Sequence, residues 1–287
     1  MDKNQALQEK EKGNIAIQKN DFETALKHYT NAIKLDPSNH IFYSNRSMCY
    51  HKLGKYSKSL DDAQRIIELN PNWPKGYSRK AVALYSLQKY DECEECYKKA
   101  LQLDPSNQDY RIDLDNLKNR ILFEELKKDD SHDFNKIKRL ISQKADPNWK
   151  NDCSTLYMGI NNYASDEIIK LLIESGGEIN LNSNNEKSSP FHRFCCNPIR
   201  KSSDHKMLSY FLDKKADPNL PNKYGITPFH YLCSVQRDTD CIQLMLDNKA
   251  DLNTENFTGT PFLALLVAHF SFTNQTQVKK RTSFLFL

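Results

Sequence analysis

The chain has 287 residues, room for two ordinary domains or one extended repeat stack. It carries 41 Lys and Arg against 37 Asp and Glu, so its net charge of +4 sets up no strong field for nucleic acid. No stretch approaches the roughly 18 apolar residues that span a bilayer, and the polar first residues do not resemble a secretory signal. Its eight cysteines form no compact disulfide framework and indicate reduced thiols. We expect a cytoplasmic protein, with the nucleus as the alternative, and neither nucleic-acid nor membrane partners.

Three prolines stand 34 residues apart, and each follows Leu-Asp or Leu-Asn: Pro37, Pro71 and Pro105. Aromatic residues keep the same spacing at Phe22, Tyr56 and Tyr90. A period of 34 is that of the tetratricopeptide (TPR) repeat, a helix-turn-helix unit. Each Pro is expected to end the second helix of its unit, because Pro cannot continue a helix.

A single unit of this kind cannot bury its own apolar face, so three units and a cap are expected to stack. The stretch Asp109–Leu126 is predicted to be that capping helix. Its apolar residues fall close to helical spacing, at Ile112, Leu114, Leu117, Ile121 and Leu122.

Residues 5–107 resemble the TPR domains of co-chaperones that bind Hsp70 and Hsp90, most densely at Lys10–Asn14, Tyr43–Ser47 and Lys75–Lys80. In that family two lysines, two asparagines and an arginine form a "carboxylate clamp" for a C-terminal Glu-Glu-Val-Asp peptide. The resemblance implies that this chain has such a clamp at the five matching positions: Lys10, Asn14, Asn45, Lys75 and Arg79.

The spacing of these five residues agrees with the resemblance. Lys10 and Asn14 are four residues apart, as are Lys75 and Arg79, so each pair lies on one helix face. Asn45 and Arg79 are 34 apart and occupy the same site in successive units. A terminal Asp offers two carboxylates, which two ammonium groups and two amides can satisfy with charge-assisted bonds, while an Arg fork suits an upstream Glu. The alternative interpretation is five ordinary polar residues on solvated helix faces.

A different sequence motif recurs after about residue 130, at Lys144–Asn148, Gly176–Asn180, Lys215–Asn219 and Lys249–Asn253. Between its copies fall Ser154–Tyr157, Ser189–His192, Thr227–His230 and Thr260–Leu263. This pattern resembles the ankyrin repeat, whose Thr-Pro-Leu-His opens the first helix. The hydroxyl residue caps that helix, and Pro sits in its first turn, where a missing N–H costs nothing. We expect the His ring to bond between neighbouring repeats.

This second array departs from the ankyrin pattern in three places. The unit at Ser189 is longer, and its extra length is expected to form a loop within Asn197–Asp204. The unit at Thr155 lacks the usual Pro and His and has Leu156 and Met158 instead. The last unit lacks a recognisable second helix, which should leave apolar surface exposed; we expect a truncated or alternatively ended chain, or a partner that covers this end.

The predicted fold is an all-α repeat protein, a TPR superhelix followed by an ankyrin solenoid with short β-turn fingers. Its predicted parts are three TPR repeats (1–107), a capping helix and junction (108–130), about four ankyrin repeats with the last incomplete (131–270), and an irregular tail (271–287). Ile121–Leu126 and Phe134–Ile141 are interpreted as a degenerate first ankyrin helix pair. The join between the arrays is therefore expected to be semi-rigid.

The predicted β-turn fingers of the second array carry exposed aromatic and basic residues, which suit a protein interface. The possible partner surface consists of Trp149, Lys150, Lys223, Tyr224 and Phe257. The alternative is that these side chains pack on the adjacent finger.

The remaining groups of Cys, His and acidic residues are interpreted as structural and not as metal or catalytic sites. Cys93-x-x-Cys96 lacks a partner pair, and in His192-x-x-Cys195 and His230-x-x-Cys233 each His is the repeat's own structural residue. The acidic pairs Asp61-Asp62 and Glu94-Glu95 are interpreted as solvated helix faces. We therefore predict no catalytic residue, no metal site and no cofactor.

The predicted function is that of an adaptor. Its TPR groove holds the C-terminus of Hsp70 or Hsp90, and its ankyrin array holds a client or a second complex. The alternatives are a scaffold for an unrelated acidic partner and the targeting fragment of a truncated enzyme.

Overall fold

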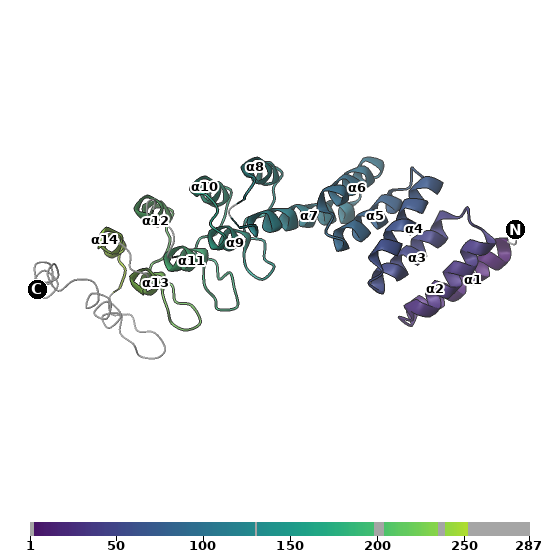
Figure 1. Ribbon diagram of the computed structural model, residues 1–287, viewed down its shortest axis with the longest axis horizontal. Coiled ribbons are helices and arrows are strands. Elements are labelled where there is room, and N and C mark those ends of the chain that lie inside the picture. Colours follow the sequence, from purple (N-terminus) through teal and green to yellow (C-terminus); the bar gives the residue numbers. More distant parts are fainter. Residues whose placement is uncertain (1–2, 130, 198–203, 235–238, 252–287) are drawn as a thin grey trace, which may run out of the picture. The chain divides into compact units, whose positions relative to one another are not determined.

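The computed structural model describes residues 3–129, 131–197, 204–234 and 239–251, shown as the coloured ribbon in Figure 1. Over these ranges the chain forms fourteen α-helices and no strand, which confirms the predicted all-α class. Contacts divide the chain into two compact units, Met1–Ile121 and Leu122–Leu287. Phe257, most of the loop predicted within Asn197–Asp204 and the predicted tail lie outside the described residues.

The first unit contains three pairs of packed helices and a seventh helix that follows them. The pairs are α1 (Lys3–Gln18) with α2 (Phe22–Leu35), α3 (His40–Lys52) with α4 (Tyr56–Leu69), and α5 (Pro74–Ser86) with α6 (Tyr90–Leu103); α7 is Gln108–Leu126. Each second helix ends at a C-cap residue directly before one of the three periodic prolines. The 34-residue period is therefore the period of the helix pairs.

Small residues lie where the two helices of a pair approach closely. A Cβ atom at Gly13 would lie 2.7 Å from Cε1 of Tyr29 on α2, so only glycine fits against this ring. In the second pair, Ser47 and Ser59 hydrogen-bond to one another's backbone carbonyls, each at 2.9 Å. In the third, the Cys93 thiol donates to the carbonyl of Ala81 at 3.2 Å, and burial raises its pKa to about 12. Cys93 is thus a packing residue.

Helix α7 buries most of the residues predicted for a cap. Leu114, Leu117, Ile121 and Leu122 are all buried, whereas Ile112 is 56% exposed. The helix crosses the division between the units, since its residues up to Ile121 belong to the first unit and those from Leu122 to the second.

The prediction that the two acidic pairs are solvated is wrong for one member of each. Asp61 and Glu95 are exposed, but Asp62 and Glu94 are buried. Asp62 accepts two hydrogen bonds from Arg46, at 2.8 Å from Nε and 2.7 Å from Nη2. Neighbouring residues on a helix point about 100° apart, so one residue of each pair, Asp62 or Glu94, turns toward the adjacent helix while the other faces solvent.

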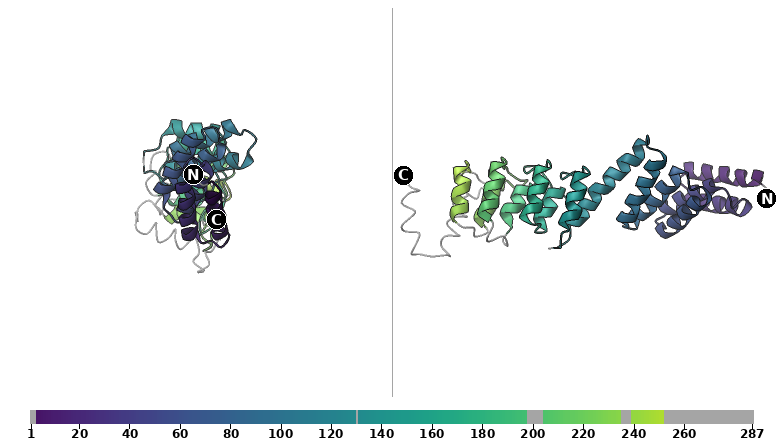
Figure 2. Two further views of the ribbon diagram at one scale, coloured as in Figure 1. Left: turned by 90° about the vertical axis from the view of Figure 1, so that its right-hand side faces the viewer. Right: turned by 90° about the horizontal axis from the view of Figure 1, so that it is seen from above.

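The second unit consists of short helices in two rows, with loops between them (Figures 1 and 2). One row holds α9 (Thr155–Asn161), α11 (Pro190–Cys196) and α13 (Pro228–Ser234); the other holds α8 (Phe134–Ser142), α10 (Asp166–Glu174), α12 (Asp204–Asp213) and α14 (Thr239–Asp247). The loops that enter α9, α11 and α13, residues 146–154, 178–189 and 217–227, are named fingers 1, 2 and 3. Their tips lie on one side of the helices.

The last turn of α7 acts as the inner helix of the first pair in this unit. The Leu126 carbonyl accepts a hydrogen bond from the Asn162 side chain at 3.2 Å, and its side chain lies against Gly159 of α9. Helix α8 packs on α10. These two elements therefore occupy the places of an ankyrin helix pair, as the degenerate motif predicts.

Hydroxyl caps and the residue three positions later connect successive repeats. Ser189 caps α11 and bonds to the Nδ1 atom of His192 at 2.8 Å, and Nε2 of that ring lies 3.1 Å from the carbonyl of Ile226 in finger 3. The predicted role of His as an inter-repeat bond is thus confirmed at His192. In the preceding repeat the N-cap residue is Ser154 and not Thr155, so every position of this repeat is numbered one residue earlier than the sequence motif suggested. Tyr157 takes the His position there, and its hydroxyl accepts from Asn184 of finger 2 at 3.1 Å.

A ladder of asparagines joins the repeats a second time. Each Asn donates from its side chain to a carbonyl in the next repeat and accepts from a backbone N–H close by. Its members are Asn148, Asn180 and Asn219. Because one side chain satisfies two backbone groups, this short polar residue is needed at the same place in every repeat.

The contact between Gly13 and Tyr29 predicts the sign of a stability change. In an open helix, Gly→Ala stabilises by about 1 kcal/mol. Here the new methyl group must displace a buried ring, so we expect Gly13→Ala to lower the free energy of unfolding by about 1–3 kcal/mol. Urea unfolding followed by circular dichroism measures the change, with Gln8→Ala on the exposed face of α1 as control. A stabilised Gly13→Ala protein would contradict the packing described here.

Candidate functional site: the clamp residues of the first unit

Two of the five predicted clamp residues meet at one buried phenol. Asn14 on α1 accepts a hydrogen bond from the Tyr29 hydroxyl at 2.8 Å. Burial raises the pKa of the Tyr29 hydroxyl to about 12. A hydrogen bond with the side chain of Asn45 on α3 acts in the opposite direction and lowers this pKa. Because the Asn14 oxygen is engaged by Tyr29, its amide nitrogen is the end that remains for other partners, and it donates to Glu11 at 3.1 Å. Tyr29 therefore orients Asn14 as a hydrogen-bond donor.

Arg79 on α5 reaches across to α3 without meeting an acid. Its Nε atom donates to the Ser44 hydroxyl at 3.4 Å, a long bond, and its charge acts on Cys49 of α3 and on Tyr110 of α7. Burial lowers the pKa of Arg79, because a half-buried guanidinium loses water and gains no carboxylate in exchange. This residue is held in place as a cation that has no counter-ion.

Lys75 lies one helical turn before Arg79 and shares its environment. Partial burial lowers the pKa of Lys75, and repulsion from the Arg79 charge lowers it further. Lys10 lies one turn before Asn14 and is half-buried. Within the described residues, no acidic side chain forms an ion pair with Lys10, Lys75 or Arg79.

Two charged residues adjacent in sequence to the predicted clamp positions are paired. Arg46, one residue after Asn45, is paired with Asp62. Glu9, one residue before Lys10, accepts from His28 at 2.8 Å and Lys12 at 2.7 Å, which together lower its pKa to about 2. Asp62 and Glu9 are thus engaged with other residues, whereas Glu11 accepts a hydrogen bond from Asn14.

The structure groups four of the five predicted residues into two pairs, Asn14 with Asn45 and Lys75 with Arg79. Tyr29 lies beside both Asn14 and Asn45, and the charge of Arg79 acts on Lys75. Lys10 is connected only by its position one turn from Asn14. Three further residues were not predicted, the hydroxyl-bearing Tyr29, Ser44 and Tyr110; Tyr29 could have been found, since it recurs in the 34-residue register with Tyr97.

The residues predicted as a partner surface on the fingers have mixed roles. Trp149 is half-buried and packs edge-to-face on Phe123, 5.7 Å between ring centroids. Lys223 and Tyr224 are exposed on finger 3, with the lysine ammonium 4.8 Å from the centre of the tyrosine ring. Packing thus accounts for Trp149, while Tyr224 is 46% exposed to solvent.

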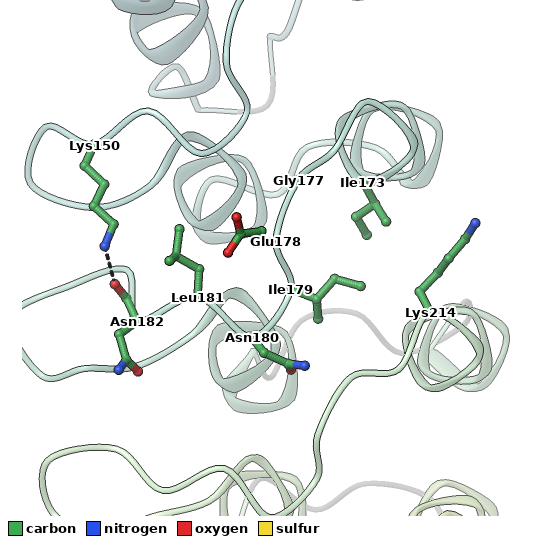
Figure 3. Close-up of a pocket in the computed structure, with 9 residues that line it drawn as sticks. All are labelled: Lys150, Ile173, Gly177, Glu178, Ile179, Asn180, Leu181, Asn182 and Lys214. Carbon is green, nitrogen blue, oxygen red and sulfur yellow. Dashed lines mark hydrogen bonds between the residues drawn. The ribbon is translucent and has the colours of Figure 1, made fainter.

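A pocket of about 660 Å³ lies between finger 2 and the ends of α10 and α12 (Figure 3). Two of its polar side chains bond within the repeat stack: Lys150 donates to the Asn182 carbonyl at 2.6 Å, and Asn180 donates to the Lys215 carbonyl at 2.9 Å. Lys150, predicted as a partner contact, therefore connects finger 1 to finger 2.

No group of three or more His, Cys, Asp or Glu side chains is placed to hold a metal ion in the described ranges. The His192 ring uses both nitrogens for hydrogen bonds, and burial lowers its pKa to about 4. None of the helices described is long and apolar enough to cross a bilayer.

Comparison with known families identifies both arrays. Residues 13–54 match the TPR repeat family, and residues 40–73 and 74–107 match the tetratricopeptide repeat family. Residues 199–246 match the family of ankyrin repeats (many copies).

Curated relatives match the first array. Stress-induced-phosphoprotein 1 of Caenorhabditis elegans is 48% identical over 106 residues, 37% of this chain and 33% of that protein. Hsp70-Hsp90 organizing protein 1 of Arabidopsis thaliana is 57% identical over 103 residues, 36% of this chain and 18% of the relative. The chain thus spans a third or less of the length of these relatives.

Among solved structures, the first TPR of Spaghetti (RPAP3) bound to the HSP90 peptide SRMEEVD is 30% identical. The match covers 42% of this chain and 96% of that one, with a TM-score of 0.41. From the family matches and the helix pairs together, the chain consists of tetratricopeptide repeats over residues 13–107 followed by an ankyrin-repeat region that includes residues 199–246.

Proposed function

We propose that this protein is an adaptor whose clamp residues bind the acidic C-terminal peptide of Hsp70 or Hsp90. The observation that carries the proposal is the set of three cations without a described acidic partner, Lys10, Lys75 and Arg79. Relatives over the same repeats are named Hsp70-Hsp90 organizing proteins, and they share 36 to 57% identity with this part of the chain.

The chemistry of a peptide that ends in Glu-Glu-Val-Asp fits these five side chains. Its last residue carries two carboxylates, one on the main chain and one on the side chain. The ammonium groups of Lys10 and Lys75 and the amides of Asn14 and Asn45 supply donors for both, and the Arg79 fork suits an upstream Glu. Bonds between ionised partners are stronger than neutral ones, so the terminal carboxylate is the main determinant of affinity.

In this proposal the ankyrin region is the second binding module of the adaptor. Two binding modules on one chain raise the effective concentration of their ligands for each other without any chemical step. In this proposal the second unit binds a client or another complex, and the protein works by tethering and not by catalysis. The cytoplasm, with the nucleus as the alternative, stays the predicted location.

Removal of either clamp lysine should weaken binding of a peptide that ends in Glu-Glu-Val-Asp. For Lys10→Ala or Lys75→Ala we expect a loss of about 10- to 100-fold in affinity, because each lysine contributes a charge-assisted bond. Lys12→Ala is the matched control, since Lys12 lies on the same helix as Lys10 but pairs with Glu9. Isothermal titration calorimetry on the full chain measures these affinities.

The peptide itself supplies the complementary test. Amidation of its terminus should weaken binding at least as strongly as either lysine substitution, and added salt should weaken binding of the free-acid peptide. Equal affinity for the amidated and free-acid peptides would exclude the clamp. A full-length acidic partner that binds normally despite an inactive clamp would favour the scaffold alternative.

The unpaired charge of Arg79 also predicts a stability change in the free protein. Arg79→Met keeps the apolar stem and removes a cation that has lost water without gaining a carboxylate, so we expect stabilisation by about 1 kcal/mol. Arg46→Met is the matched control; it leaves Asp62 buried and unpaired and should destabilise by about 3–5 kcal/mol. Urea unfolding gives both values, and a destabilised Arg79→Met protein would indicate a structural role for Arg79.

A further inference from the structure

One carboxylate of the chain itself lies at the predicted clamp. Glu11 follows Lys10 on α1, and its Oε2 atom accepts a hydrogen bond from the Asn14 amide at 3.1 Å. Burial is the main cause of the raised pKa of Tyr29, the phenol that bonds to Asn14, and the Glu11 charge adds to it. Glu11 is therefore close to both groups, and it already uses the end of Asn14 that would serve a ligand.

The repeat register explains why this carboxylate lies among the predicted donors. Glu11, Asn45 and Arg79 follow one another at intervals of 34 residues, so they occupy equivalent positions on α1, α3 and α5. Two members of this row are predicted clamp donors, and the third is an acceptor. The first helix pair thus presents negative charge at the position where the next two present an amide and a guanidinium.

The bond from Asn14 to Glu11 is not needed to orient the amide. The Tyr29 hydroxyl donates to the Oδ1 atom of Asn14 at 2.8 Å, and Tyr29 is only 1% exposed, whereas Glu11 is exposed. Because the amide group is planar, a fixed oxygen also fixes the direction of its nitrogen. Glu11 therefore occupies a donor that Tyr29 has already positioned.

No cation holds Glu11 away from Asn14. Among the described residues its carboxylate forms no ion pair, and Lys12, the next residue, pairs with Glu9 at 2.7 Å. A carboxylate that approaches Asn14 from outside therefore meets a second carboxylate at the same amide. Like charges so close to each other repel, and this repulsion disfavours the bound state.

We propose that Glu11 is an internal competitor of the ligand, which lowers the affinity of the clamp for carboxylate peptides by occupying the amide of Asn14. This inference rests on the proposed function, because it concerns the same site. A ligand must either displace Glu11 or bind beside its charge, and both routes cost free energy. The affinity of the clamp is thus set partly by one exposed acid and not only by the five donors.

The substitution Glu11→Gln tests the sign of this effect, because it keeps the shape of the side chain and removes its charge. We expect binding of a peptide that ends in Glu-Glu-Val-Asp to become about three- to tenfold tighter, since a competing charge-assisted bond and a repulsion are removed. Isothermal titration calorimetry on the full chain measures the change. Glu23→Gln is the matched control. It removes an exposed acid of α2 whose partner is Lys55, at 3.5 Å, and should leave the affinity unchanged.

A double-mutant cycle separates competition at Asn14 from general repulsion. If Glu11 acts by occupying Asn14, the gain from Glu11→Gln should disappear in the Asn14→Ala background. A gain of the same size in that background would mean that Glu11 acts through its charge alone, and it would overturn the competitor.

A further measurement needs no peptide. The side-chain amide of Asn14 gives a pair of ¹H–¹⁵N signals that are absent from the Asn14→Ala spectrum. In the free protein Glu11→Gln should shift this pair, and Glu23→Gln should not. Unshifted signals in Glu11→Gln would overturn the contact.

The outcomes for this inference and for the proposed function can be told apart. Unchanged or weaker peptide binding by Glu11→Gln would overturn the competitor alone, and weaker binding would indicate that Glu11 positions Asn14. If neither the unsubstituted chain nor Glu11→Gln binds the peptide, the Hsp70 and Hsp90 proposal fails, and the competitor fails with it.

Discussion

Two cations that lie near each other without a carboxylate, Lys75 and Arg79, are the interaction on which the proposed clamp depends. Arg79 and Lys75 repel each other and lose water, and both effects lower the pKa of Lys75. Asp62 and Glu9 do not relieve this cost, because they are engaged with Arg46 and with His28 and Lys12. In the proposed complex, a carboxylate of the peptide would relieve both costs, and this relief would favour binding.

The packing of helices within and between repeats holds the predicted clamp residues in place. Each helix pair buries small residues against the next helix, as Gly13 does against Tyr29, and the same Tyr29 then orients Asn14. In the second unit, asparagines such as Asn180 lock one repeat to the next through two hydrogen bonds. A change in packing would therefore act on the binding residues as well as on stability.

The sequence predicted the helix pairs because residues at equal spacing in a repeat protein occupy equivalent positions in successive units. The period of 34 predicted the helix pairs, and the Ser-Pro-Phe-His motif predicted the His192 bond between repeats. The five clamp positions come from the resemblance to co-chaperone TPR domains and stay a prediction. The sequence did not predict that Asp62 and Glu94 are buried or that Tyr157 takes a His position. These features depend on which side chains meet across helices, and a repeat pattern shared by every unit does not contain that information.

The central claim is that the clamp residues hold a terminal carboxylate, and the most direct measurement is a crystal structure of the chain with a peptide ending in Glu-Glu-Val-Asp. The account predicts the terminal Asp within hydrogen-bond distance of Lys10, Asn14, Asn45 and Lys75. A peptide bound in the same crystal with its terminus away from these four residues would contradict it.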